Sequence, residues 1–499
     1  MQSAKTSTTT PDPAFLKRVF GLDQFRPFQA EALTHVLEKR DLLLLLPTGG
    51  GKSLVYQYVA GLGEGLVLVV SPLIALMDDQ VLKTEKLGLR GRQLHSGLDR
   101  PTREARLKEV DEGKVDILFV TPERFRKPEF REVLAALVAR GELRLLAVDE
   151  AHCISQWGHD FRPDYSRLGE IRTFLGHPPT IALTATATAN VQNDILKSLN
   201  MEGATILRAP MHRTNLGLHV HDVYGWDEKI RGIFGLHHQV VASGGGSVVV
   251  YTALINSLYK VKRELERLGL QPLMYHGQLN AGQRRKTLRD FMADDNAIML
   301  ATPAFGLGID KPNIRCVIHA EIPGSIESYF QEVGRAGRDG LPATGQLLLD
   351  QDDLSIQEEF LKWGNPEEPV IEQVYRLIEK RDPDLDQRGF DYLREMINFH
   401  NKRDYRAETS VAMLERWGCL AVATDLRFPY VAVGEPGQAE FSSMKTETRR
   451  RVTSQKLYQL AQLLEMKSGC RQQDVLAYFG ESIAPCGICD LCAAKGAGA

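Results

Sequence analysis

Long apolar runs are absent from this sequence, and their absence argues against a membrane partner. The strongest apolar stretches, residues 42–46 and 66–77, are far shorter than the ~20 residues that span a bilayer, and Ser71 and Pro72 interrupt the second. Residues 1–13 lack the apolar core of a secretory signal, which predicts a disordered tail and a cytoplasmic protein.

A strong net charge and a dense set of cysteines are also missing. Sixty-one Lys and Arg against sixty-four Asp and Glu give a formal net charge of −3, so any polyanionic partner must be bound by local patches. Seven cysteines in 499 residues do not make a disulfide scaffold, yet four of them lie close together near the C-terminus. At roughly 100–200 residues per domain, the length allows about three or four domains.

Short apolar runs alternate with helix-period segments along two stretches of the chain, which indicates buried parallel strands with crossover helices. This α/β pattern predicts two tandem RecA-like parallel-sheet lobes over 14–208 and 209–352, the second series being introduced by a loop at 243–247. The strands predicted for the first lobe are 42–46, 66–70, 117–120, 145–148 and 181–183. Those predicted for the second lobe are 248–251, 273–276, 298–301, 317–319 and 345–349.

Helical patterns replace the α/β alternation after residue 350. Three helices and a small hairpin predict a possible winged-helix domain over 366–437, and a further helical run leads into the cysteine cluster of a module over 441–499. The predicted helices are 370–380, 388–400 and 407–417, and the hairpin strands are 419–424 and 430–433.

The segment LPTGGGKS at 46–53 has the context of a phosphate-binding loop, because an apolar strand precedes it and a helical run follows it. Its Lys would meet the β and γ phosphates, and its Ser hydroxyl would hold Mg²⁺. Gly is missing at the first position of the usual pattern. A Gly-rich turn before a helix often has no phosphate-binding role. The expected contacts to nucleotide are Thr48, Gly49, Gly50, Gly51, Lys52 and Ser53.

Two adjacent acids, Asp149 and Glu150, follow the strand predicted at 145–148. Open α/β sheets bind ligands at the carboxyl ends of their strands. Asp149 would hold magnesium and Glu150 would orient and deprotonate the attacking water. Two solvated acids at the start of a helix are the alternative, which the phosphate loop upstream makes a poor one.

Four further side chains fit a nucleotide site. The amide of Gln29 can pair with the adenine edge, and Arg26 can stack on the ring. Arg335 and Arg338 stand in a Gly-rich segment that suits an arginine finger reaching a phosphate held by the other lobe. Structural salt bridges are the plainer explanation for the two arginines, but they do not explain the glycines.

Taken in order, these segments resemble the RecQ-family DNA helicases of helicase superfamily two, over about two thirds of the chain. The missing first Gly is usual in that family. The resemblance implies ATP hydrolysis coupled to 3′ to 5′ translocation on single-stranded DNA and to duplex unwinding, in DNA repair or recombination at the nucleoid. The matching motifs are FRPFQ at 25–29, PTGGGKS at 47–53, SPLIALMDDQ at 71–80, TPER at 121–124, DEAH at 149–152, LTAT at 183–186, ATPAFGLGID at 301–310 and QEVGRAGRDG at 331–340.

The segment at 153–165, CISQWGHDFRPDY, resembles the aromatic-rich loop that couples DNA binding to hydrolysis in RecQ enzymes. Aromatic faces stack on bases, and cationic side chains meet phosphate. The residues expected to bind DNA or couple it to hydrolysis are Trp157, His159, Phe161, Arg162, Thr184 and Thr186. Asp310 is expected to face the nucleotide from the second lobe.

Four cysteines near the end of the chain offer enough thiolates for a closed tetrahedral zinc site. Together with YFGE at 478–481 they resemble the RecQ zinc-binding module. Fuller family members place a winged helix after this module, whereas here the candidate winged helix precedes it and seven residues follow the last cysteine. We therefore expect the usual C-terminal elements to be absent from their usual places. The predicted zinc ligands are Cys470, Cys486, Cys489 and Cys492.

The region 366–437 holds ten basic and fourteen acidic residues, so a broad DNA-binding face is not evident. Lys402, Arg403 and Arg406 could form a local DNA contact or simply a solvated face. The segment FPY at 428–430 is a candidate strand-separating pin at the hairpin tip.

These observations predict an ATP-, magnesium- and zinc-dependent DNA helicase acting on single-stranded and tailed duplex DNA. Two alternatives stay open. An RNA helicase would use the same two lobes, and a DNA-stimulated translocase would hydrolyse ATP without separating strands.

Overall fold

The structure is a computed structural model that divides into two compact units. One comprises Met1–Ala320, Glu327–Leu348 and Met466–Ala499, and the other Glu321–Ile326 and Leu349–Glu465. The described residues are 10–47, 49–72, 74–95, 97–155, 163–306, 309–398, 405–423, 426–437 and 443–496.

The first lobe of the larger unit is a parallel sheet whose described strands run in the order β3-β4-β2-β5-β6-β1-β7. The strands are β1 Leu42–Leu45, β2 Leu66–Val70, β3 Gly91–Leu94, β4 Ile117–Val120, β5 Leu143–Val148, β6 Thr180–Thr184 and β7 Thr205–Arg208. The helices are α1 Pro13–Phe15, α2 Gln29–Leu37, α3 Lys52–Gly61, α4 Ile74–Lys86, α5 Arg100–Asp111, α6 Pro128–Ala139, α7 Leu168–Phe174 and α8 Ala189–Ser198. Other helical turns are η1 Leu16–Phe20, η2 Pro122–Arg126, η3 Ala151–Ile154 and η4 Pro163–Arg167.

The continuous apolar runs of this lobe are explained by burial on both faces of the sheet. Along β1, Leu43 and Leu45 join the core on one face while Leu42 and Leu44 join the core on the other. Alternation across a strand requires this division. The four leucines are therefore fixed in register by two cores at once.

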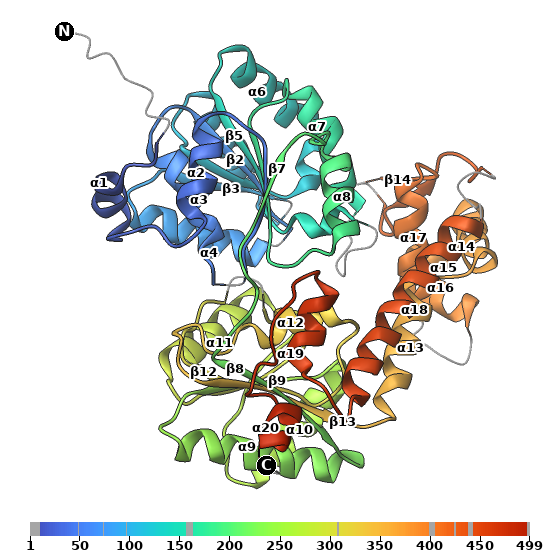
Figure 1. The fold of residues 1–499 in the computed structure, drawn as a ribbon. Coiled ribbons are helices and arrows are strands. Elements are labelled where there is room, and N and C mark those ends of the chain that lie inside the picture. Colours follow the sequence, from blue (N-terminus) through green and yellow to red (C-terminus); the bar gives the residue numbers. More distant parts are fainter. Residues whose placement is uncertain are drawn as a thin grey trace. The chain divides into compact units, whose positions relative to one another are not determined.

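The second lobe carries a sheet in the order β10-β11-β9-β12-β13-β8 among its described strands. The strands are β8 Leu216–Asp222, β9 Ser247–Tyr251, β10 Leu273–Tyr275, β11 Ile298–Ala301, β12 Ile314–His319 and β13 Ala343–Leu349. The helices are α9 Gly225–Ala242, α10 Ile255–Arg267, α11 Ala281–Ala293 and α12 Ile326–Val333. Residues 209–215 connect the two sheets as a single segment between β7 and β8 (Figure 1).

Three strands were not predicted from the sequence, namely β3, β7 and β8. Each stands at an end of its sheet, and each mixes polar with apolar residues. Edge strands are paired on one side only, so they need no continuous apolar run. The predicted strands, by contrast, all correspond to strands of the structure.

The C-terminal part of the larger unit, α19 Arg471–Tyr478 and α20 Asp490–Gly496, packs on the second lobe. The rings of Phe330 on α12 and Phe479 have centroids 5.5 Å apart. Asp490 pairs with Arg471 at 2.8 Å and accepts a hydrogen bond from the backbone N–H of Val220 in β8 at 3.1 Å. The cysteine-bearing segment is thereby tied to the edge strand of the second sheet.

The smaller unit is helical with one antiparallel hairpin. None of the described helices in either unit is long and apolar enough to cross a membrane. The elements are α13 Asp353–Gly364, α14 Glu368–Lys380, α15 Pro383–Arg388, α16 Phe390–Ile397, α17 Arg406–Arg416, β14 Leu420–Val422, β15 Tyr430–Ala432 and α18 Ser443–Glu465.

The prediction that Phe428 is part of an exposed strand-separating pin is wrong. This side chain is 3% exposed and belongs to the core of the smaller unit. Its ring lies 5.4 Å from that of Phe390 and 5.5 Å from that of Tyr430, centroid to centroid. The turn chemistry of the segment suggested an exposed tip, but the packing of three aromatic rings draws it inward.

We predict that Phe428→Ala destabilises the smaller unit by about 3–5 kcal/mol, because it removes a buried aromatic ring and leaves a cavity. Hydrogen exchange should show faster exchange of the α14 and α17 amides. The neighbouring exposed Arg427, changed to Ala, should leave this protection unaltered. Native protection in Phe428→Ala would contradict the packing role.

Candidate functional site

The phosphate-binding loop connects β1 to the first turn of α3. Gly49 and Gly51 have φ angles of 81° and 76°, a left-handed conformation that side chains rarely tolerate. A Cβ atom on Gly51 would lie 2.4 Å from Nε2 of Gln29. Helix α3 begins at Lys52, so its unpaired N–H groups and the positive end of its dipole lie at this loop. Thr48 lies outside the described residues.

The side chains of Gln29 and Arg26 donate hydrogen bonds to the backbone of this loop. Nε2 of Gln29 donates to the carbonyl oxygens of Gly50 at 3.3 Å and Gly51 at 3.1 Å, and its Oε1 accepts from the backbone N–H of Arg26 at 2.8 Å. The Arg26 guanidinium donates to the carbonyl oxygen of Gly49. Both side chains line a cleft that this loop borders.

Asp149 and Glu150 stand at the end of β5, and both are buried, with 7% and 6% exposed. Glu150 has a φ of 47°, and its backbone N–H donates to Oδ1 of Asp149 at 3.0 Å. Burial raises the pKa of Asp149, Glu150 raises it further, and Lys52 partly offsets both effects. Two buried acids beside one lysine form an oxygen donor set suited to a hard divalent cation.

His152 links the acids to β6. Its Nδ1 lies 3.3 Å from Oε2 of Glu150 and 3.0 Å from Oγ1 of Thr184. Thr184 in turn donates to the carbonyl oxygen of Thr186 at 3.1 Å. Thr184 and Thr186 are therefore joined to Glu150 through one imidazole, within the first lobe.

Tyr56 lines the same cleft and was not predicted from the sequence. Its ring is 1% exposed, and its hydroxyl donates to Oε1 of Gln80 at 3.4 Å. Burial raises its pKa, and the charges of Asp149 and Glu150 raise it further. Tyr56 stands one turn after Ser53 on α3, a spacing that could have identified it, but the apolar run around it reads as core.

Arg335 and Arg338 reach the cleft from the second lobe. The Arg335 guanidinium donates to the carbonyl oxygen of Gly306, and Arg338 pairs with Asp310 at 2.9 Å. Burial lowers the pKa of Arg338, and Arg335 lowers it further. The Nε atoms of both arginines are buried and have no hydrogen-bond partner among the described residues. Two such cations side by side favour an anion between them.

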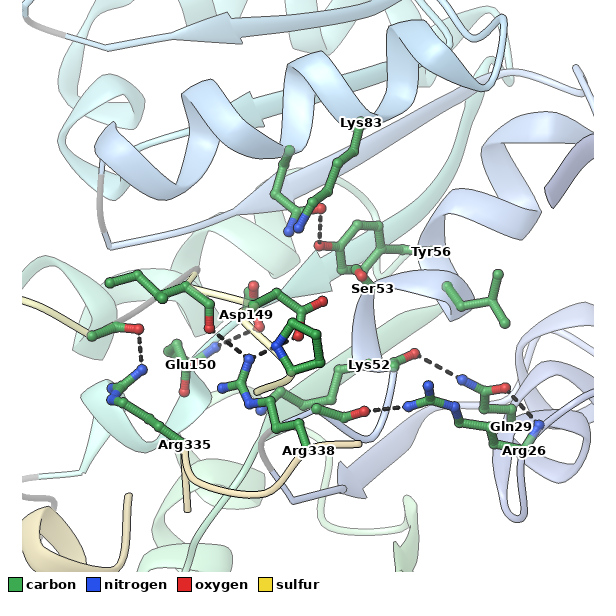
Figure 2. Close-up of a pocket in the computed structure, with 18 of the residues that line it drawn as sticks. Arg26, Gln29, Lys52, Ser53, Tyr56, Lys83, Asp149, Glu150, Arg335 and Arg338 are labelled. Carbon is green, nitrogen blue, oxygen red and sulfur yellow. Dashed lines mark hydrogen bonds and ion pairs between the residues drawn. The ribbon is translucent and has the colours of Figure 1, made fainter. Parts of the chain in front are cut away.

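These groups surround one cleft of about 460 Å³ that both lobes line (Figure 2). A Cβ atom on Gly49 would come within 3.3 Å of Cδ of Arg338, so the second-lobe arginine lies directly against the phosphate-binding loop. The volume is in the usual range for small-molecule sites. Its lining includes Arg26, Gln29, Gly49, Gly51, Lys52, Ser53, Asp149, Glu150, Asp310, Arg335 and Arg338.

The residues predicted to bind DNA are placed only in part. Trp157, His159, Phe161 and Arg162 lie outside the described residues, as do Lys402 and Arg403. Arg406 begins α17 in the smaller unit.

The four C-terminal cysteines gather at one point. Their Sγ atoms all lie within 4.8 Å of one another, and the backbone N–H of Cys486 donates to Sγ of Cys470 at 3.2 Å. In a tetrahedral site with Zn–S bonds of about 2.3 Å, neighbouring sulfurs are about 3.8 Å apart, so the cluster fits this metal with little adjustment. The two cysteines with buried side chains are Cys470 and Cys489.

The fold is shared with solved helicase structures. The chain aligns with the Mycobacterium smegmatis helicase Lhr bound to single-stranded DNA and AMP-PNP at TM-score 0.56 and 22% identity, covering 85% of this chain and 61% of that one. Dbp5 of Saccharomyces cerevisiae, bound to RNA and ADP BeF3, aligns at TM-score 0.55 and 16% identity, with coverage of 72% and 93%. At these identities the likeness shows the two-lobe fold alone.

Sequence comparisons are more specific. Residues 26–194 match the DEAD/DEAH box helicase model, 232–340 the helicase conserved C-terminal domain, and 437–493 the RecQ zinc-binding model. The ATP-dependent DNA helicases RecQ of Bacillus subtilis and Haemophilus influenzae are 38% and 37% identical, over 74% and 71% of this chain and 61% and 55% of their own lengths. The probable ATP-dependent DNA helicase RecS of Bacillus subtilis is 33% identical over 94% of this chain and 88% of its own length. With both helicase domains and the zinc-binding domain matched, the chain belongs to the RecQ family of ATP-dependent DNA helicases.

Proposed function

We propose that this protein is a 3′ to 5′ helicase that uses ATP and Mg²⁺ to move along single-stranded DNA and open tailed duplexes in repair or recombination. One observation carries the proposal: phosphate-binding, acidic and arginine side chains from two lobes line a single cleft. Acting on chromosomal DNA, the protein would work in the cytoplasm at the nucleoid.

In this cleft Lys52 is assigned to the β and γ phosphates, and Gln29 and Arg26 to the adenine end. Ser53 and Asp149 would hold Mg²⁺, which when bound supplies positive charge to the phosphate oxygens. Glu150 is assigned as the base that orients water and takes its proton. Its contact with His152 supports this role, because an imidazole at 3.3 Å restrains the carboxylate.

Arg335 and Arg338 are assigned to the charge that develops on the γ-phosphate. Because they come from the second lobe, nucleotide draws the lobes together and its hydrolysis lets them part. The path from Glu150 through His152 to Thr184 and Thr186 is the proposed link between the nucleotide and the lobe surface that meets DNA.

The aromatic-rich loop at 153–165 is the proposed sensor of single-stranded DNA, with Trp157 and Phe161 stacking on bases and Arg162 and His159 meeting phosphate. This loop and the zinc-binding module argue against the alternative that the protein is an RNA helicase. The translocase alternative rests on the smaller unit, where a winged helix over 366–437 stays a prediction and the proposed pin residue Phe428 is buried.

Changing Lys52 to Ala should reduce ATP hydrolysis by about 10²–10³-fold, because the cleft loses the cation that faces the phosphates. Steady-state hydrolysis with saturating single-stranded DNA measures the loss, and circular dichroism checks the fold. Lys86→Ala, on the exposed side of α4, is the matched control and should hydrolyse ATP normally. Normal turnover by Lys52→Ala would refute the assigned site.

We expect one zinc ion per chain in protein purified without chelator, since four thiolates form a closed site. Cys489→Ser should lose the metal and unfold at a lower temperature, because structural zinc contributes directly to folding. Cys316→Ala, which removes a buried thiol from β12, should keep its zinc. Elemental analysis decides the matter, and a full complement of zinc in Cys489→Ser would exclude the cluster as its ligand.

Strand displacement tests the proposed function as a whole. Matched duplexes with a 3′ tail, a 5′ tail or no tail are mixed with protein, ATP and Mg²⁺, and displacement is expected from the 3′-tailed duplex alone. Hydrolysis should be stimulated by single-stranded DNA far more than by RNA of the same sequence. DNA-stimulated hydrolysis without displacement would favour the translocase, and stimulation by RNA alone would favour an RNA helicase.

A further inference from the structure

The segment that joins the two lobes is held by the zinc-binding module. Glu481 accepts two backbone N–H groups of this connection, from Met211 at 2.8 Å and from His212 at 3.3 Å. Gln472 on α19 donates to the carbonyl oxygens of Arg213, at 3.3 Å, and of Leu216. The lobes are therefore linked by a segment whose backbone is fixed by a third part of the chain.

Arg213, within this segment, reaches the turn at 334–339 that follows α12. Its guanidinium donates to the carbonyl oxygens of Ala336 at 3.0 Å and Gly337 at 2.7 Å. Both residues are buried, and buried backbone carbonyl groups need hydrogen-bond donors, which the guanidinium supplies. These carbonyls lie between Arg335 and Arg338.

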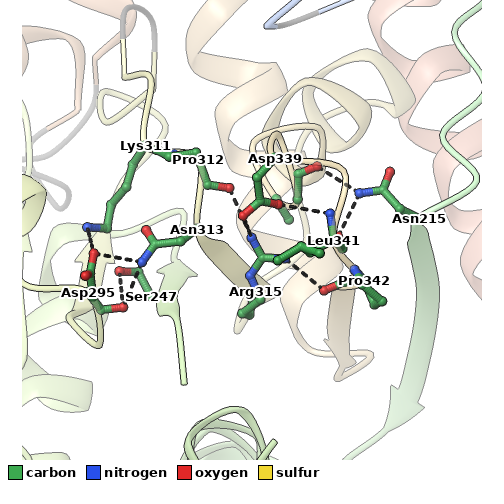
Figure 3. Close-up of polar contacts among 12 residues, drawn as sticks. Asn215, Ser247, Asp295, Lys311, Pro312, Asn313, Arg315, Asp339, Leu341 and Pro342 are labelled. Carbon is green, nitrogen blue, oxygen red and sulfur yellow. Dashed lines mark hydrogen bonds and ion pairs between the residues drawn. The ribbon is translucent and has the colours of Figure 1, made fainter. Parts of the chain in front are cut away.

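Asn215 also donates to the backbone of this turn (Figure 3). Its Nδ2 donates to the carbonyl oxygens of Gly337 and Leu341, each at 2.8 Å. A Cβ atom on Gly337 would lie 2.6 Å from this nitrogen, so glycine is required for the approach. Nε of Arg213 donates to Oδ1 of Asn215 at 3.2 Å, which fixes the direction of the amide.

Arg315 on β12 completes the arrangement. Its guanidinium pairs with Asp339 and donates to the carbonyl oxygens of Pro342 and Pro312, each at 3.1 Å (Figure 3). The loop that carries the cleft arginines is therefore anchored by side chains outside the cleft. An offset of about 1 Å in a catalytic group can cost 10²-fold in rate, so such anchoring has direct chemical value.

We propose that Arg213 and Asn215 are positioning residues for Arg335 and Arg338, and that Glu481 of the zinc-binding module sets their position through the interlobe segment. The module then acts on ATP turnover through 211–215, independently of any contact it makes with DNA. This inference rests on the proposed function, because it assumes that the two arginines act on the nucleotide.

Asn215→Asp tests the loop contact, because a carboxylate of the same shape cannot donate to the two carbonyl oxygens. Glu481→Ala tests the route from the module. Each should lower kcat for DNA-stimulated ATP hydrolysis about tenfold, a misplacement effect. The affinity for a fluorescent ADP analogue should stay unchanged, since the phosphate-binding loop is intact. Zinc content and melting temperature show that the variants fold.

Lys467→Ala is the matched control, because it removes a contact of the module with β8 that does not touch the interlobe segment, the exposed ion pair with Asp222 at 2.9 Å. It should hydrolyse ATP at the normal rate. A loss of kcat in Lys467→Ala equal to that in Glu481→Ala would overturn the specific route through 211–215.

A comparison with a combined variant separates positioning from general damage. If Asn215 acts through the two arginines, adding Asn215→Asp to a variant that lacks both, Arg335→Ala with Arg338→Ala, causes little further loss of kcat. The inference would be overturned if the fold-losses in kcat of the separate changes multiplied in the combined variant. It would also be overturned if Asn215→Asp and Glu481→Ala both had normal kcat, and in either case the proposed function would stand. Normal kcat in Arg335→Ala itself would instead defeat the assigned role of the arginines, and the inference with it.

Discussion

The rest of this structure depends on two adjacent carboxylates, Asp149 and Glu150, which are buried at the end of β5. Burying Asp149 beside Glu150 is unfavourable unless positive charge compensates it. The first lobe supplies Lys52 and the N-terminus of α3, and the second supplies Arg335 and Arg338. Charge balance in the cleft thus depends on both lobes, and the proposed nucleotide with its magnesium ion would complete it.

This dependence gives the chemistry a mechanical consequence. A ligand can shift the equilibrium between lobe arrangements only by the difference in its contacts with them. In the proposed function, the difference resides in Arg335 and Arg338 of the second lobe, which would face phosphates held by the first lobe. The interlobe segment is then more than a tether, because Arg213 and Asn215 hold the loop that bears those cations.

The sequence allowed much of this to be predicted, for physical reasons that also explain the omissions. Central strands such as β1 need apolar residues on both faces, and phosphate loops need glycines before a helix, so both leave strong patterns. The edge strand β8 leaves none, and Tyr56 is hidden among apolar neighbours on α3. The role of Arg213 was not predicted because it depends on backbone carbonyls more than one hundred residues away, and backbone partners have no sequence signature.

In the hairpin of the smaller unit, a sequence pattern led to a wrong prediction. Its aromatic segment has the composition of an exposed turn, yet Phe428 lies in the core. The local sequence pattern limits the conformations that a segment can adopt, and tertiary packing decides which of them forms and which side chains are buried.

The docking of the cysteine-bearing segment has one more consequence, which concerns solubility. Strand β8 ends its sheet, and an open sheet edge invites pairing with another chain. Asp490 occupies the N–H of Val220, and the carbonyl oxygen of Ile488 lies 2.8 Å from where a Cβ on Gly217 would stand. The module therefore covers this edge, and a chain that lost its metal would uncover a template for aggregation.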